Sequence, residues 1–191
     1  KLNKISKKNK FIKIFKNKKK GLGSAINTGV RKSKSEYLCI FMCDLSDDTN
    51  DIIKYFKIIK KDKNLHAVFG TRFSKFSKVK NYPLFKLILN RLANNLIKII
   101  TLTDYNDFTN AFKIYKKETL NKLMPLVSEN FNIFLELPLK IISRKYKYKV
   151  IPINWNGRTT GISKFKIKEI GSMYIFTLCY CLLEKILLNK K

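Results

Sequence analysis

The sequence predicts an α/β fold, in which helices flank a mostly parallel sheet. Short apolar runs rich in β-branched and aromatic residues, typical of buried strands, alternate with stretches of helical period. The connections between them are short, and a strand-helix-strand order with short connections gives a parallel, right-handed unit. With 191 residues, the chain is long enough for one domain with a substantial core.

The first 70 residues carry this alternation. Leu2 and Ile5 have helical spacing in a Lys-rich segment. After them we expect, in order, a strand at 11–15, a helix from Gly21, a strand at 37–42, a helix at 51–61 and a strand at 65–70. The inward face of the 51–61 helix is expected to hold Ile52, Ile53, Phe56 and Ile59.

The second half is less regular. We expect a basic loop at 71–81, helices at 83–102, 117–123 and 132–146, strands at 111–115 and 147–155, and a Gly-, Thr- and Ser-rich loop at 156–164. The chain then carries a strongly apolar helix or helix pair at 167–188. A spanning helix needs roughly 20 apolar residues, and Glu184 is costly in lipid. We therefore expect an interfacial helix on a membrane, with a core or oligomer helix as the alternative.

Composition narrows the classes of function. The formal charge of +28 suggests nucleic acid as a partner, but the basic residues are almost all Lys and are spread along the chain. A Lys-rich surface that favours anionic lipid headgroups explains the charge at least as well. The four Cys have neither metal-ligand nor disulfide spacing, which indicates a reducing cytoplasm, and the chain shows no secretory signal.

The 37–42 strand ends at acidic residues, which are scarce in this chain. Asp44, Asp47 and Asp48 follow it directly, and the carboxyl edge of an open α/β sheet is where ligands bind. Carboxylate oxygens suit a hard divalent cation that also contacts substrate phosphates. For Asp47 and Asp48 the alternative is an N-cap role at the start of the next helix.

Three of the five arginines stand beside expected loops or helix faces. Arg72 closes a strand, Arg91 lies in the long helix and Arg158 sits in the Gly-rich loop. Arg binds phosphate through a bidentate fork that Lys does not reproduce. The segment 160–164 adds backbone amides, a hydroxyl and an ammonium, which suit closure over a pyrophosphate or a phospholipid head.

Six motifs in order carry a resemblance to a known family. They are KGLGSAINTG at 20–29, the strand end at Asp44, GTRF at 70–73, RLAN at 91–94, DFTNAF at 107–112 and RTTGISK at 158–164. Over about residues 10 to 170 the chain resembles the family 2 glycosyltransferases of the dolichyl- or polyprenyl-phosphate mannosyltransferase type.

The resemblance implies a GT-A-type, Rossmann-like fold for residues 1–166 and a membrane-associating helical tail at 167–191. The family's N-terminal strands, which end in a motif that grips the nucleotide, have no counterpart here, so we expect that an N-terminal portion is missing. The implied activity is inverting transfer of a sugar, typically mannose from GDP-mannose, to a polyprenyl or dolichyl phosphate at the cytosolic membrane face. The implied partners are a nucleotide sugar (GDP-mannose or a UDP-sugar), the lipid phosphate and the membrane surface, without nucleic acid.

The resemblance also assigns residues. A Mg²⁺ or Mn²⁺ ion is implied at Asp44, Ser46 and Asp47, although Met42 replaces the first acid of the family's metal motif and Ala111 replaces a usual Gly. The catalytic residues implied are Asp44, Arg91, Asp107 and Arg158. The substrate-binding residues implied are Gly23, Asn27, Arg72, Arg91, Glu136, Arg158, Ser163 and Lys164. A non-catalytic relative and a basic nucleic-acid-binding protein remain the alternatives.

Overall fold

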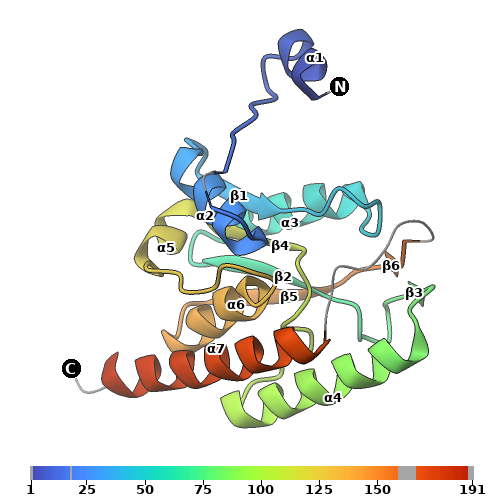
Figure 1. Cartoon of the computed structure of the whole chain (residues 1–191), viewed down its shortest axis with the longest axis vertical. Helices are drawn as coiled ribbons and strands as arrows, with labels where there is room; N and C mark the ends of the chain where they lie inside the picture. The colour runs from blue at the N-terminus through green and yellow to red at the C-terminus, as the bar shows by residue number, and fades with distance from the viewer. Residues whose placement is uncertain (1, 18, 159–166, 189–191) are drawn as a thin grey trace.

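A computed structural model describes residues 2–17, 19–158 and 167–188 of the chain (Figure 1). The helices are α1 (Leu2–Lys8), α2 (Leu22–Lys32), α3 (Thr49–Lys61), α4 (Leu84–Thr101), α5 (Lys117–Lys122), α6 (Ile133–Ser143) and α7 (Ile167–Leu188). The strands are β1 (Tyr37–Ile40), β2 (Ala67–Thr71), β3 (Val79–Lys80), β4 (Lys113–Lys116), β5 (Tyr148–Pro152) and β6 (Trp155–Asn156).

Four strands form the main sheet in the order β1-β4-β2-β5. β4 is antiparallel to both β1 and β2, whereas β2 and β5 are parallel. β1, β2 and β5 therefore run in one direction and β4 alone is reversed. The mostly parallel α/β sheet is confirmed, with a reversed strand inserted between β1 and β2. β3 and β6 form a separate parallel pair.

The sheet is covered on both faces. Alternate residues of β2 enter different clusters: Val68 packs with Tyr55 and Ile59 of α3, whereas Phe69 packs with the cluster that contains α6. α6 is buried over nearly its whole length, because the sheet covers one side of it and α7 the other (Figure 1).

The expected strand at 11–15 is wrong, since this segment has no regular secondary structure and its apolar side chains are exposed. Within the described ranges no strand pairs with it, so it has no ladder of backbone hydrogen bonds. The expected strand at 147–155 is split into β5 and β6. The break follows Pro152, where Ile153 still donates to the Thr71 carbonyl but Trp155 donates to that of Lys78.

The buried face of α3 differs from the expected one. Tyr55 is fully buried with Ile59, whereas Ile53 is 55% and Phe56 41% exposed. The Tyr55 hydroxyl donates a hydrogen bond to the Phe112 carbonyl at 3.3 Å, which satisfies its polar end inside the core. The inward face is therefore rotated relative to the prediction.

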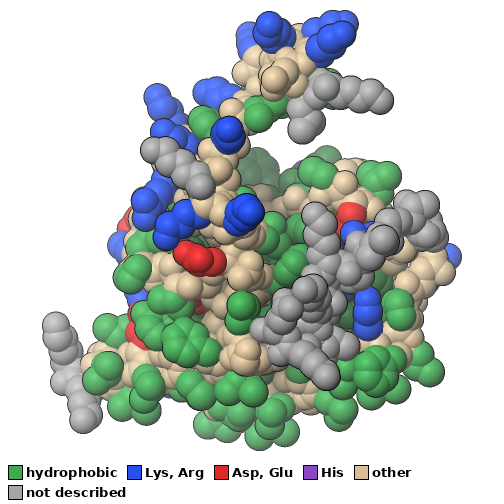
Figure 2. Space-filling view, viewed as in Figure 1, with side chains coloured by type: hydrophobic (Ala, Val, Ile, Leu, Met, Phe, Trp, Pro, Cys, Tyr) green, Lys and Arg blue, Asp and Glu red, His purple; other side chains and the backbone are tan. Residues whose placement is uncertain are grey.

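α4 and α7 leave a broad apolar surface uncovered, which Figure 2 shows as green side chains along the lower edge of the molecule. Its exposed members include Leu84, Phe85, Ile88, Leu92, Leu96, Ile99, Ile175, Phe176, Leu183, Ile186 and Leu187. The segment Gly171–Leu188 is long and apolar enough to cross a membrane, by length and composition only. We call this combined face of α4 and α7 the apolar surface.

The opposite side of α7 faces the protein and carries polar contacts beside its apolar ones. Thr177 accepts a hydrogen bond from the Asn132 side chain at 2.9 Å, and Glu184 pairs with Arg144 and, at 3.6 Å, with Lys140. These contacts fix which side of α7 faces the protein. α7 therefore packs on the protein through polar contacts and through apolar side chains such as Cys181 and Leu178, and it leaves an apolar outer side exposed.

Candidate functional site

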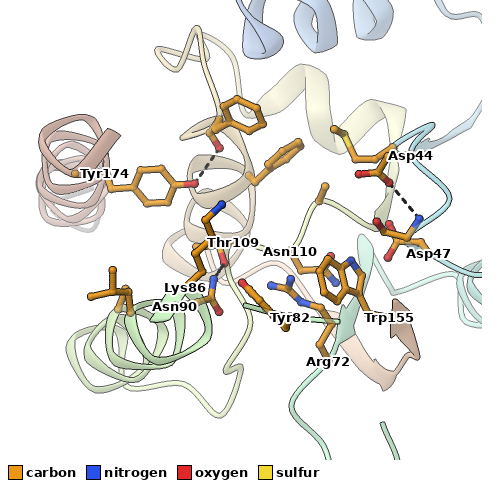
Figure 3. Close-up of a pocket in the computed structure, with 18 of the residues that line it drawn as sticks. Asp44, Asp47, Arg72, Tyr82, Lys86, Asn90, Thr109, Asn110, Trp155 and Tyr174 are labelled. Atoms are coloured by element: carbon orange, nitrogen blue, oxygen red, sulfur yellow. Dashed lines mark hydrogen bonds between the residues drawn. The ribbon is translucent and has the colours of Figure 1, made fainter. Parts of the chain in front are cut away.

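A cavity of about 550 Å³ lies at the edge of the sheet where β1, β2 and β5 end. The reversed β4 begins at the same edge, so the turn before β4 also reaches this cavity. The wall is made by residues that follow β1, β2 and β5, by the 109–111 turn, and by α4, α6 and α7. Figure 3 shows Asp44, Asp47 and Trp155 at one end of it and Tyr174 at the other.

Asp44, Ser46 and Asp47 are brought together on this wall, as the sequence predicts. Asp44 accepts a hydrogen bond from the backbone of Ser46 at 3.2 Å. Asp47 is only 8% exposed, and within the described chain its Oδ1 and the Ser46 Oγ have no hydrogen-bond partner. Burial raises the pKa of Asp47 to about 6, although Arg72 opposes the shift. A buried carboxylate oxygen without a partner indicates a place for a ligand.

Asp48 has the N-cap role that the sequence offered as the alternative to ligand binding. It is exposed, it is the N-cap of α3, and its side chain accepts a hydrogen bond from the Asn50 backbone at 2.9 Å. The two readings of the acidic run thus separate: Asp48 caps the helix, whereas Asp47 faces the cavity.

The donor atoms at this end fit a hard divalent cation. In the part of the chain that the structure describes, no three His, Cys, Asp or Glu side chains gather into a metal site. Asp44, Asp47 and the Ser46 hydroxyl offer oxygen only, and Mg²⁺ is usually held by one or two carboxylates together with substrate phosphates. Met42 also lines the wall, but it offers no oxygen.

Arg72 and Asp107 form a buried bidentate pair. Arg72 donates to Asp107 from Nε at 2.9 Å, from Nη2 at 2.7 Å and from its backbone at 2.8 Å. Arg72 is 8% exposed and lines the cavity, whereas Asp107 is fully buried behind it. The predicted phosphate-binding Arg72 is therefore on the wall. The predicted catalytic Asp107 reaches the cavity only through Arg72.

The turn before β4 is held from inside the protein by Lys113. Its ammonium donates to the carbonyls of Phe108, at 3.0 Å, and Asn110. Burial lowers the pKa of Lys113 to about 7, although Asp107 opposes the shift. Sequence reasoning missed this residue because nothing in the order of residues distinguishes a buried Lys among so many exposed ones.

Lys86 is a second residue that sequence reasoning missed. It lines the cavity from the first turn of α4 and has no ion-pair partner among the described residues. Asn90 lies one turn further along the same wall and donates to the Thr109 hydroxyl at 2.7 Å. Helical spacing could have pointed to Lys86, because positions 86, 90 and 93 share one face of α4.

Besides Asp107 and Arg158, four predicted site residues lie off the described cavity wall. Arg91 donates to the Asn106 carbonyl at 3.1 Å and lies 4.2 Å from the Phe73 ring centre. Glu136 accepts from the backbones of Val127 and Ser128 at 2.9 and 2.8 Å, which shapes the loop before α6.

Gly23 and Asn27 are the other two, and both belong to α2. A Cβ on Gly23 would lie 2.1 Å from the Ser128 carbonyl oxygen, so this residue permits close packing of the helix. The Asn27 Oδ1 is buried and has no hydrogen-bond partner in the described chain. Arg158 is exposed and is not among the described lining residues, and Ser163 and Lys164 lie outside the described residues.

Comparisons with known proteins agree with the predicted family. The profile described as glycosyl transferase family 2 matches residues 1–124. Dolichol-phosphate mannosyltransferase of Pyrococcus furiosus is 28% identical over 162 residues, which cover 82% of this chain and 44% of that protein. Polyprenol monophosphomannose synthase of Mycolicibacterium smegmatis is 25% identical over 122 residues, which cover 58% of this chain and 46% of that protein. The chain thus spans less than half the length of these curated relatives.

Solved structures share the fold at low identity. Glucosyl-3-phosphoglycerate synthase from Mycobacterium tuberculosis, in complex with UDP, aligns with a TM-score of 0.60 and 12% identity over 85% of this chain and 55% of that one. The complex of the same enzyme with Mn²⁺, UDP-glucose and glycerol 3-phosphate aligns with a TM-score of 0.56 and 13% identity. The alignment covers 87% of this chain and 55% of that one. The predicted GT-A-type α/β fold is confirmed.

Proposed function

Because the chain belongs to glycosyl transferase family 2, we propose that it moves a sugar from a nucleotide sugar to a polyprenyl phosphate at the cytosolic face of a membrane. The observation that carries this proposal is the shape of one cavity. Its acidic end holds Asp44 and the buried, unpartnered oxygen of Asp47, and its other end is apolar and flanked by α4 and α7. A donor that carries a diphosphate suits the first end, and an isoprenoid acceptor suits the second.

The names of two relatives support the finer assignment. One is a dolichol-phosphate mannosyltransferase and the other a polyprenol monophosphomannose synthase. We therefore propose mannose as the sugar and GDP-mannose as the donor, with a UDP-sugar as the alternative donor.

At the acidic end, Asp44, Asp47 and Ser46 would hold a Mg²⁺ or Mn²⁺ ion. When bound, such an ion stabilises the negative charge that develops on the leaving nucleoside diphosphate. Arg72 adds a fixed positive charge on the same wall, because Asp107 locks its guanidinium in place. Gly23 and Asn27 remain predicted donor contacts from α2.

On the α4 side of the cavity wall, Lys86 supplies a cation for the acceptor phosphate. A polyprenyl phosphate oxygen is already anionic at neutral pH, so a single displacement at the anomeric carbon needs no strong general base. Catalysis then rests on positioning, and Lys86 and Asn90 stand on the wall where that phosphate would be held. Arg91, Arg158, Ser163 and Lys164 remain predicted partners of the acceptor, and Glu136 a predicted substrate contact.

The apolar surface supports a membrane location. An isoprenoid chain stays in the bilayer, so the cavity must open next to lipid. Leu89 and Ala93 of α4 and Ile175 of α7 line the cavity, and the outer sides of the same helices are exposed and apolar. We propose that α4 and α7 together lie in the membrane interface, with α7 interfacial rather than spanning.

The acidic run offers a matched test. We expect Asp47→Asn in the full-length protein to lower mannose transfer from GDP-mannose to polyprenyl phosphate about 100-fold or more, because it removes a carboxylate that would hold the divalent ion against the diphosphate. Asp48→Asn is the control: Asn is an equally good N-cap, so transfer stays near the wild-type rate. Transfer is measured in vesicles with Mg²⁺. Full activity of Asp47→Asn would refute the proposed site.

A further inference from the structure

Two aromatic side chains form part of the cavity wall at its acidic end. Trp155 of β6 and Tyr82, just before α4, are both half-buried, and their ring centres lie 4.9 Å apart at an angle of 45°. Figure 3 shows them beside Asp47 and Arg72. The roles proposed above for charge and metal use neither ring, so this aromatic pair needs its own explanation.

The pair is held in place by its surroundings. The guanidinium carbon of Arg72 lies 5.5 Å from the Trp155 ring centre and 5.6 Å from that of Tyr82. Arg72 is itself locked by the buried Asp107. The rings therefore present a surface that is formed before any ligand binds, which lowers the entropic cost of binding.

The backbone of Trp155 is joined to the acidic loop. Residue 155 forms a β-bridge with Asp47, and the backbone of Asn156 donates to the Ser46 carbonyl at 3.0 Å. On the other side, a Cβ on Gly157 would lie 2.2 Å from the Asn81 carbonyl oxygen and 3.1 Å from the Trp155 ring. This packing sets the ring at a fixed place next to the carboxylates.

We propose that Trp155, with Tyr82 beside it, is the platform on which the sugar ring of the donor stacks. The inference rests on the proposed function. A pyranose ring has a face of C–H groups, which suits the negative π-face of an aromatic ring. The sugar and the ribose are both bonded directly to the diphosphate, but only the sugar must also face the acceptor phosphate in the same cavity. The sugar is therefore the group of the donor that we place next to Asp44 and Asp47. The isoprenoid chain belongs at the opposite, apolar end, and the base is separated from the carboxylates by the ribose and the diphosphate.

Binding of two ligands that differ only by the sugar tests the platform. We expect Trp155→Ala in the full-length protein, with Mg²⁺, to bind GDP-mannose about 3- to 10-fold more weakly than the wild type, the usual effect of one aromatic contact. Its affinity for GDP stays unchanged, because GDP lacks the mannosyl ring that would stack. Trp155→Phe keeps a ring and retains most of the affinity for GDP-mannose. Isothermal titration measures the constants of the three proteins for both ligands, and the same proteins are run with UDP-glucose and UDP.

Fluorescence gives a second readout. The emission of Trp155, taken as the wild-type spectrum minus that of Trp155→Phe, should change when GDP-mannose binds and stay constant when GDP binds. Phe76→Ala is the control for loss of an aromatic ring, since Phe76 is exposed and lies away from the cavity wall. Unfolding midpoints check that each variant folds.

The outcomes separate the platform from its premise. An equal loss of affinity for GDP-mannose and GDP would assign Trp155 to the base or to the framework and overturn the platform. No loss for either ligand would overturn it too. A wild-type protein that binds none of the four nucleotides would refute the proposed function and, with it, the platform.

Discussion

Asp107 shows how a single buried residue serves a site that it does not touch. It accepts three hydrogen bonds from Arg72, which lines the cavity, but Asp107 itself is not among the described lining residues. Sequence reasoning gave it a catalytic role because it precedes a polar turn in the family pattern. In the structure Asp107 fixes the orientation of Arg72, and we propose that it acts on the site in this way.

We expect Asp107→Asn to destabilise the protein by about 3–5 kcal/mol, because it leaves the buried Arg72 guanidinium without a counter-charge. The free energy of unfolding in urea measures this. Asp62→Asn is the control, since Asp62 pairs with Lys147 at 3.0 Å at the surface, and its loss should cost much less. Similar losses in both variants would show that the Arg72–Asp107 pair is not a structural anchor.

Lys113 gives the protein a pH dependence of known sign. Its pKa is lowered from 10.5 to about 7 by burial, so between about pH 7 and 10 the unfolded chain binds a proton that the folded chain does not. The stability of the wild type should therefore rise with pH in this window, relative to Lys113→Met, by up to about 1.4 kcal/mol per pH unit. Below pH 7 the difference between the two proteins stays constant.

Urea unfolding of both proteins at pH 7.5, 8.5 and 9.5 measures the difference. Methionine has a similar length and no charge, so the variant supplies the baseline for all other titrating groups. A constant difference across the three pH values would mean that Lys113 keeps its proton in the folded state.

At the scale of elements, α4 and α7 combine an inner side that lines the cavity with an outer side that is apolar and exposed. The apolar character of both helices was visible in the sequence. Their joint exposure was not, because a helix rich in Leu and Ile reads the same whether its outer side meets protein or lipid. The polar contacts of α7 also escaped notice, because Glu184 finds Arg144 and Lys140 only in the folded chain.

Charged substitutions test the apolar surface. We expect Leu92→Glu together with Ile99→Glu in α4 to lower binding to liposomes by about tenfold or more, since each buried aliphatic side chain contributes about 1.5–3 kcal/mol. Ile53→Glu is the matched control, because Ile53 is similarly exposed but lies on α3. Sedimentation with liposomes measures the bound fraction. Equal retention of both variants would place the membrane contact elsewhere.

The sequence predicted the α3 helix but not which of its faces is buried. Helical period placed Phe56 inward and gave Tyr55 no role, because a hydroxyl counts against burial in a sequence pattern. In the structure the Tyr55 hydroxyl reaches the Phe112 carbonyl, and Phe56 instead packs at the rim on Tyr37, at 5.7 Å between ring centres. The hydrogen-bond partner of the Tyr55 hydroxyl comes from a segment distant in sequence, so helical periodicity alone assigned the wrong buried face to α3.

At the scale of the whole molecule, the class of fold and the acidic edge of the sheet were predictable. Alternating patterns and short connections are local features, and so is a strand that ends in carboxylates. The reversal of β4 was not predictable, because a strand of four residues carries no sign of its direction. That reversal brings the 109–111 turn to the cavity, so the same ambiguity hid part of the site.

The place of β4 also bears on how the chain folds as it leaves the ribosome. β1 and β2 have no direct pairing, and β4 joins them only after residue 116 has been made. The second edge of β2 stays unpaired for longer, because its partner β5 is formed by Tyr148–Pro152. Two strand edges therefore stay open during synthesis, and such edges pair readily with other chains. The nascent chain should therefore depend on chaperones until β4 and β5 have been made.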